Sequence, residues 1–267
     1  MKGGCHLVCG PDSAGRSALV GQYVSAPLHI SKPWREEGGL LIVNVINSTA
    51  GLFAGDVIES TFEVRTGGQM LVTSPSASRA YRMPSGQAAV RQSIRVSEGG
   101  WLEMLPSFFI PHAGSDYFQE TSVHLESAAR FLWFETFVPG RVAHGEAWQF
   151  TRFESRFHLS HGGRAIARET YSLTPHCPSV QALREQFPSG CHAACYAAGA
   201  DFPDGLLAAV SMLHQPDCWI GCTRLDAPAI AIRLVAADNI RLSRALVKIR
   251  ALLHGAFERP VPSLRRA

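Results

Sequence analysis

Six carboxylates recur at comparable places along this chain of 267 residues, and they are the side chains best suited to do chemistry. They are Asp56, Glu59, Glu103, Glu135, Glu146 and Glu169. Carboxylate oxygens with exchangeable water hold a divalent transition-metal ion weakly, which suits passage of the ion better than storage. Carboxylates that face each other in a protein interior are costly unless something compensates them. The alternative for each residue is an ordinary carboxylate on the surface or in a hydrogen bond.

The first two of these carboxylates follow a tight turn of small residues, at positions 49–55. Gly51 and Gly55 allow backbone angles closed to other residues and let another segment approach closely. The next residues alternate as in a strand, so that Asp56 and Glu59 point to opposite faces unless a bulge near Val57 brings them together. We predict that Asp56 lines an internal cavity, and that Glu59 does so only if the strand is bent.

The cysteines offer a second chemistry, a zinc–thiolate site. Six of the seven form Cys-x-x-x-Cys pairs, which are Cys5/Cys9, Cys191/Cys195 and Cys218/Cys222. With His192 or His214 they could complete a zinc site. However, residues four apart in a strand lie about 13 Å apart, which is too far for one ion to bridge. Buried, reduced thiols are the preferred interpretation, and the zinc site remains the alternative.

Motifs of common enzyme classes are absent from the sequence. It contains no phosphate-binding loop, no His-x-x-x-His or His-Glu-x-x-His spacing and no Gly-x-Ser-x-Gly turn. A binding or scaffold protein is therefore favoured over an enzyme. No run of about 18 apolar residues exists, and the apolar part of the N-terminus is too short for a signal peptide, so we expect a cytoplasmic protein without a membrane span.

A weak repeat predicts the fold class. Small-residue turns begin at Gly67, Gly99, Ala128 and Gly162, with spacings of 32, 29 and 34 residues. Each is followed by an apolar strand, and return strands run between them. Regular turns and short strands indicate an all-β body, and a period near 30 favours stacked units over a single barrel. The pattern alone leaves an ordinary sandwich open.

Three regions follow from the distribution of these signals. Residues 1–25 are rich in Gly and Ser and are expected to be a flexible N-terminal segment, with a first strand over residues 23–30. Residues 26–175 form the β body. Residues 176–267 form a small mixed part packed on it, with two helices, one from Asp204 to about His214 and one from Asp238 to Gly255.

The C-terminal region is basic. Residues 240–267 carry seven basic side chains against Glu258 alone, including Arg265 and Arg266 at the end. Because only Phe257 interleaves these charges, a protein-docking face is favoured over nucleic-acid binding. Arg241, Arg244 and Lys248 form the polar stripe of the last predicted helix.

An ordered set of segments resembles the UreD (also called UreH) family of urease accessory proteins. The strongest signals are the Gly-Asp turn, Leu102-Glu103-Met104-Leu105-Pro106, and residues 140–146, which read Gly-Arg-x-Ala-x-Gly-Glu. The likeness covers residues 26–175 well and residues 200–257 weakly. The chain differs from the family pattern at Ala50, where a glycine is usual, and at its non-aromatic C-terminus.

The resemblance implies an elongated, β-helix-like body and a non-enzymatic scaffold that assembles the nickel centre of urease. It implies that the protein binds apo-urease and UreF, and UreG through UreF. It implies an internal path for transient Ni²⁺, with no tightly bound cofactor. The positions that match this path are Asp56, Glu59, Glu135 and Glu169. Residues 239–254, with Arg241, Arg244 and Lys248, are expected at or near UreF.

Overall fold

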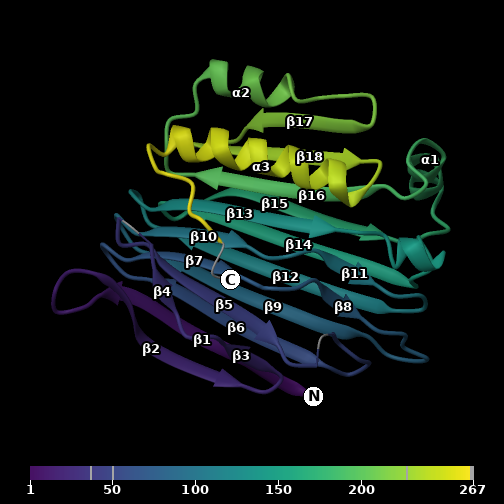
Figure 1. Cartoon of the computed structure of the whole chain (residues 1–267), viewed down its shortest axis with the longest axis horizontal. Helices are drawn as coiled ribbons and strands as arrows, with labels where there is room; N and C mark the ends of the chain where they lie inside the picture. The colour runs from purple at the N-terminus through teal and green to yellow at the C-terminus, as the bar shows by residue number, and fades with distance from the viewer. Residues whose placement is uncertain (37, 50, 227, 265–267) are drawn as a thin grey trace.

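The computed structural model describes the whole chain except positions 37, 50, 227 and 265–267. Ala50 of the turn and Arg265 and Arg266 of the basic tail therefore lie outside the described residues. The described residues form two large β-sheets that stack face to face, with three α-helices and one short 3₁₀ helix (Figure 1).

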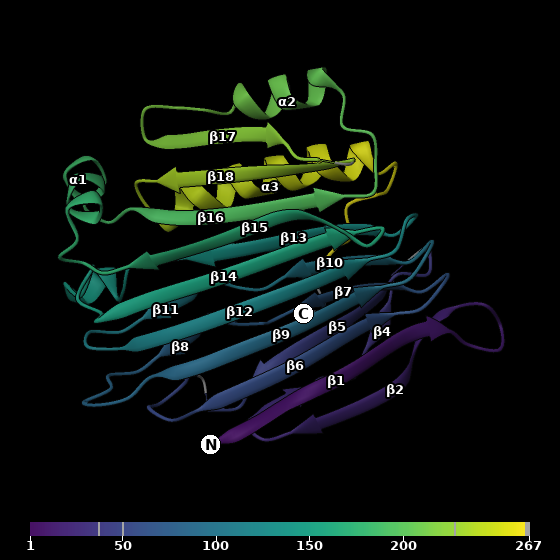
Figure 2. The same ribbon diagram turned by 180° about the vertical axis from the view of Figure 1, so that it is seen from behind.

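The first sheet has seven strands within the described residues, and Figure 2 shows it from its outer side. Its order is β15 (Arg164–Leu173), β14 (Arg152–His161), β12 (Asp116–Leu125), β9 (Ala88–Val96), β6 (Val57–Val64), β1 (Lys2–Pro11) and β2 (Ser17–Ser25).

The second sheet has eleven described strands. Its main path is β17 (Cys218–Arg224), β18 (Ala229–Ala236), β16 (Cys191–Ala198), β13 (Arg130–Phe137), β10 (Trp101–Leu105), β7 (Gln69–Thr73), β5 (Leu41–Asn47) and β3 (Leu28–Ile30). Three short strands pair beside this path, which are β4 (Trp34–Arg35), β8 (Ser78–Ala80) and β11 (Phe109–Pro111).

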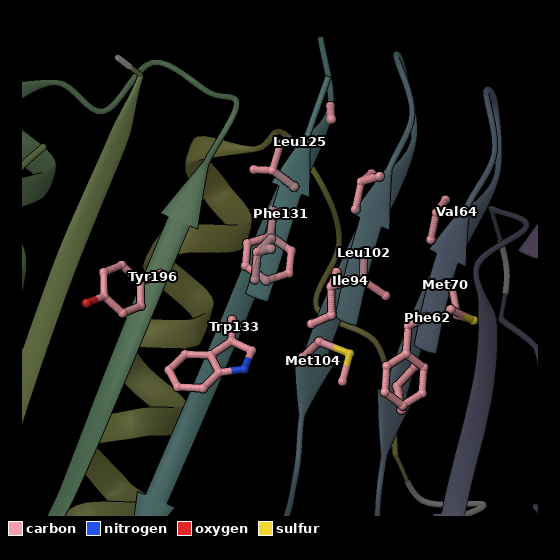
Figure 3. Close-up of a cluster of buried hydrophobic side chains, with 14 of the residues drawn as sticks. Phe62, Val64, Met70, Ile94, Leu102, Met104, Leu125, Phe131, Trp133 and Tyr196 are labelled. Carbon is pink, nitrogen blue, oxygen red and sulfur yellow. The ribbon is translucent and has the colours of Figure 1, made fainter. Parts of the chain in front are cut away.

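The body is a β-solenoid, as predicted. The chain passes from one sheet to the other and back, so that each coil of about 30 residues adds one strand to each sheet. Successive coils place equivalent residues in register through parallel pairing. One such column is Leu41, Met70, Leu102 and Phe131. These columns meet side chains of the facing sheet and form the main hydrophobic core, part of which Figure 3 shows.

The expectation that residues 1–25 are flexible is wrong. β1 lies between β6, to which it is parallel, and β2, to which it is antiparallel. Its inner side chains Leu7 and Cys9 are fully buried. The glycines that suggested a loose segment instead allow neighbouring backbone to pack closely against β1. A Cβ on Gly4 would lie 1.6 Å from the carbonyl oxygen of Glu59. The strand expected over residues 23–30 is also wrong, because β2 ends at Ser25 and β3 begins at Leu28.

The C-terminal part continues the second sheet. β16 pairs antiparallel with β13, and β18 and β17 follow it. The two predicted helices are α2 (Asp204–Ser211) and α3 (Asn239–Ala256). A third helix, α1 (Pro178–Gln186), lies just after the predicted boundary between the β body and the mixed part and was missed, although a proline at its first turn is a favourable start.

Helix α3 lies across the outer face of the second sheet (Figure 1). Asp238 caps its N-terminus by accepting a hydrogen bond from the backbone N–H of Arg241. Its apolar stripe packs against the sheet. A buried ion cluster also holds the helix to the body, because Arg250 and His254 both contact the fully buried carboxylate of Glu103 on β10. None of the helices in the described chain has the length and apolar content needed to cross a membrane.

Candidate functional site

A cavity of about 190 Å³ lies between the two sheets. Most of its wall is apolar, but a row of polar side chains crosses it perpendicular to the strands. Ser60, Gln92 and Thr121 stand in register on β6, β9 and β12, and all three point inward. Gln119, two residues before Thr121 on β12, leads from this row to Glu135 on β13 of the facing sheet, to which it donates a hydrogen bond. The solenoid thus converts inward positions of successive coils into a polar track through an otherwise apolar interior.

Glu135 is the only acidic side chain on the described wall of this cavity. It is 6% exposed. It accepts hydrogen bonds from Ser155, at 3.0 Å, and from Gln119 and Tyr171. Burial raises the pKa of Glu135 to about 7, because the bonds from Tyr171 and Ser155 offset only part of the cost of desolvation. The carboxyl group is therefore poised between its neutral and ionised forms near neutral pH.

Tyr171 on β15 joins Glu135 to His192 on β16. The Tyr171 hydroxyl lies 3.1 Å from Nε2 of His192, which is itself 3.8 Å from Oε1 of Glu135. Burial, aided by the charge of Arg233, lowers the pKa of His192 to about 4, so the imidazole is neutral at pH 7.

The Tyr171 hydroxyl and the neutral His192 ring each carry one proton, and these two protons set the direction of the hydrogen bonds among Glu135, Tyr171 and His192. Burial and the neighbouring Glu135 raise the pKa of Tyr171 well above its usual range, so its hydroxyl keeps its proton. The hydroxyl donates a hydrogen bond to ionised Glu135. Nε2 of His192 then donates to the Tyr171 oxygen. Nδ1 of His192 is buried and finds no hydrogen-bond partner among the described residues.

A second polar group lies beyond the first in the same layer. Arg233 on β18 donates to both carboxylate oxygens of Glu169 on β15, at 3.0 and 2.6 Å, and to the hydroxyl of Tyr196 at 2.6 Å. Glu169 and Arg233 are each about one-third exposed. The predicted path residue Glu169 thus lies where the space between the sheets opens to solvent, with its charge balanced by a guanidinium.

Asp56 is 7% exposed, but it is not among the residues that line the cavity. One of its oxygens accepts from the backbone N–H of Phe53 at 2.8 Å, and the other contacts the amino group of Met1. The turn before it needs its glycines, since Gly55 has a φ of 82° and a Cβ on Gly51 would lie 2.5 Å from the ring of Tyr81. Asp56 therefore closes the turn and anchors the start of β1.

Glu59 points away from the cavity. β6 pairs with β1 and β9 without a break in register, so no bulge turns this side chain inward. The Glu59 side chain is 69% exposed and lies 3.7 Å from Arg91 on the outer face of the sheet. The condition that would have placed Glu59 on an internal path is not met.

The structure also separates the groups of the zinc–thiolate alternative. Cys191 and Cys218 both pair with Ala236 from opposite sides, so two strand spacings, roughly 9.5 Å, lie between them. His192 points to the opposite face of β16 from Cys191, and Nδ1 of His214 accepts from the backbone of Ile220. Within the described part of the chain, no three His, Cys, Asp or Glu side chains come close enough to hold a metal ion.

The polar stripe of α3 is partly engaged within the chain. Arg241 pairs with Asp217 and Asp238 at the start of the helix. Arg244 and Lys248 are exposed, and neither forms an ion pair with any other described residue. These two side chains are the free part of the predicted docking stripe.

The sequence did not predict the residues around Glu135, of which only His192 was named, as a possible zinc ligand. Tyr171, Ser155, Gln119 and His192 come from four strands and share no local motif. Their one signal in the sequence is alternation, which places each of them on the inward face of its strand.

Comparison with known proteins identifies the family of this chain. The family profile described as "UreD urease accessory protein" matches residues 1–266. The chain belongs to the UreD family. A protein of Opitutus terrae named "Urease accessory protein UreD" is 40% identical over 263 residues, which is 96% of each chain. Proteins of the same name from Deinococcus radiodurans and Acetivibrio thermocellus are 31% and 26% identical, and cover 94% and 91% of this chain and 90% and 94% of their own lengths. UreD membership connects the chain with urease maturation as an accessory protein.

Proposed function

We propose that this UreD protein is a non-catalytic scaffold that joins apo-urease to an accessory complex of UreF and UreG, and that Ni²⁺ passes through it to urease. The observation that carries the proposal is the polar row that ends at Glu135 in the cavity between the sheets. A buried carboxylate without a positively charged partner is costly, and a function that requires its charge accounts for its presence there.

The chemistry of the row suits a travelling ion. Hydroxyl and amide oxygens of Ser60, Gln92, Thr121 and Gln119 can replace water molecules around the ion as it moves. Glu135 supplies one negative charge, which lowers the cost of bringing a cation between two apolar sheets. One carboxylate with neutral oxygens binds weakly enough to release the ion again, as passage demands.

We place Glu169 next on the path, because it lies beyond Glu135 in the same layer and is partly exposed. An ion that reaches Glu169 has to displace Arg233 from it, which a partner protein at that edge is suited to do. We leave Glu59 out of the path because its carboxylate lies on the outer face. For docking of UreF we retain the face of α3 that carries Arg241, Arg244 and Lys248.

The test is co-production of urease and its accessory proteins with Glu135→Gln. We expect the variant to be recovered with UreF and apo-urease as the natural chain is, while urease activity and nickel per urease active site fall several-fold. Glu59→Gln is the matched control, since it makes the same change on the outer face, and it should behave like the natural chain.

Two outcomes would contradict the proposal. Full nickel content with Glu135→Gln would remove this carboxylate from the path. Loss of the complex with Glu135→Gln would show that the residue supports the fold or the docking surface instead of the ion.

A further inference from the structure

Glu135, Tyr171 and His192 meet at one point between the two sheets. This point lies at one end of the cavity, because Glu135 lines the cavity whereas Tyr171 and His192 lie behind it. Two ligand atoms, one carboxylate oxygen and one imidazole nitrogen, face each other there with a phenol between them. A neutral imidazole lone pair is a strong ligand for transition-metal ions.

We propose that Glu135 and His192 form a two-ligand stopping point for a divalent transition-metal ion, and that the Tyr171 hydroxyl occupies the ion's place in the metal-free protein. The inference rests on the proposed passage of Ni²⁺ through this cavity, and it adds an imidazole ligand and a residue that competes with the ion.

The separation of the two ligand atoms supports this assignment. Oε1 of Glu135 and Nε2 of His192 are 3.8 Å apart. With metal–ligand distances of about 2.1 Å, ligands at neighbouring octahedral positions lie roughly 3.0 Å apart and opposite ones roughly 4.2 Å apart. The observed distance falls between these values, so side-chain adjustments of a few tenths of an ångström suffice. Gln119 and Ser155 already surround the carboxylate and can bond to water on the ion.

The tautomer of His192 is free to change. In the metal-free protein Nε2 carries the proton and donates a hydrogen bond to the Tyr171 hydroxyl oxygen. Binding of an ion through Nε2 requires that proton on Nδ1 instead. Because no described residue hydrogen-bonds to Nδ1, no donor holds that nitrogen unprotonated; the N–H formed in the exchange is in turn buried without an acceptor, a cost that keeps binding of the ion weak.

An imidazole at this point would supply selectivity. Carboxylate, hydroxyl and amide oxygens also suit Mg²⁺, whereas imidazole nitrogen favours Ni²⁺, Co²⁺ and Zn²⁺. A track of oxygen ligands alone therefore does not distinguish nickel from magnesium, and His192 does.

The experiment is a titration of the purified full chain with Co²⁺, whose visible spectrum reports its ligands, and then with Ni²⁺. His192→Gln should weaken binding by at least about tenfold and remove one imidazole nitrogen from the X-ray absorption spectrum of the bound metal. Millimolar Mg²⁺ should compete with the metal only in His192→Gln. His176→Gln is the control, since it makes the same change at an exposed histidine outside the cavity.

Tyr171→Phe is the decisive variant. It removes the hydroxyl that bonds to both ligands and keeps the ring that packs against His192 and Phe153. We expect tighter metal binding by several-fold, and a misfolded protein would not show such a gain. Binding that is unchanged in both Tyr171→Phe and His192→Gln would overturn the inference and assign the metal to surface histidines.

The inference and the proposed function can fail separately. Suppose that Glu135→Gln abolishes nickel transfer to urease but metal binding is unchanged in His192→Gln and Tyr171→Phe. The proposed path is then supported, and the stopping point at His192 is wrong. If the titrations behave as expected but urease is fully activated by Glu135→Gln, the metal site exists and the path does not use it.

Discussion

Replacement of Glu135 by glutamine should make the protein more stable at alkaline pH. The pKa of Glu135 is raised from 4.5 to about 7 by burial. Between these values the folded protein keeps a proton that the unfolded chain has lost, so the free energy of unfolding decreases as pH rises. The slope is about 1.4 kcal/mol per pH unit, which gives a loss of about 3 kcal/mol by pH 8.

The glutamine variant has no such titration and nearly the same shape. Other ionisable groups are present in both proteins, so their effects cancel in the comparison. The free energy of unfolding of Glu135→Gln, relative to the natural chain, should therefore rise by about 3 kcal/mol between pH 4.5 and pH 8. Urea denaturation at several pH values measures this difference. A difference that is constant with pH would refute the claim that the hydrogen bonds to Glu135 offset only part of the cost of its burial.

Glu103→Gln is the control, because Glu103 is equally buried on the opposite face of the same sheet. Burial raises the pKa of Glu103, but hydrogen bonds from His254 and Arg250 outweigh that effect and hold the pKa below its usual value. Removal of the carboxylate leaves Arg250 buried without its counter-charge, which typically costs about 3–5 kcal/mol. The two buried glutamates should thus respond with opposite signs at pH 8.

Three further predictions test other parts of the structure. Asp56→Ala should lower the free energy of unfolding by about 1–3 kcal/mol and speed hydrogen exchange at the start of β1, since the backbone N–H of Phe53 loses its acceptor and the amino group of Met1 loses its ion-pair partner; reduced urease activation with the complexes intact would return Asp56 to the path. Charge reversal at Arg244 and Lys248 should weaken the complex with UreF and its salt dependence while the melting temperature stays within a few degrees; unchanged pull-down would remove these residues from the interface. Alkylation should modify Cys177 first, because hydrogen bonds from Ser179 lower its pKa whereas burial raises the pKa of the other six thiols; Cys177→Ser should remove the fast phase, and a fast phase that persists would contradict this assignment.

The repeating coils could be predicted from the sequence because each strand is marked by a local pattern of residues. Turns with small residues recur at each coil, and strands β10 and β13 begin directly after the predicted turns at Gly99 and Ala128. The N-terminal strands were not, because Gly3 and Gly4 in β1 resemble a loop. Their lack of a side chain is required by the carbonyl groups of Ala26 and Glu59, which are distant in the sequence.

Only part of the candidate site could be predicted from the sequence, for a related reason. Alternation along a strand shows which residues share a face, and the opposite faces predicted for Asp56 and Glu59 agree with a buried Asp56 and an exposed Glu59. It does not show which strands lie across from each other. Glu135, Tyr171 and His192 meet because β13, β15 and β16 belong to two sheets that face one another, and that pairing is set by the packing of the whole solenoid.

If the ion passes through the cavity between the sheets, blocking that cavity must reduce its delivery to urease. Val90→Phe places a ring in a cavity of about 190 Å³ without altering any charge. The measurement is transfer of radioactive Ni²⁺ to apo-urease in a reconstituted complex, with the melting temperature and complex formation checked in parallel. We predict that Val90→Phe, in an intact complex, delivers several-fold less nickel per urease active site than the natural chain. Undiminished delivery through the blocked protein would contradict passage by this route.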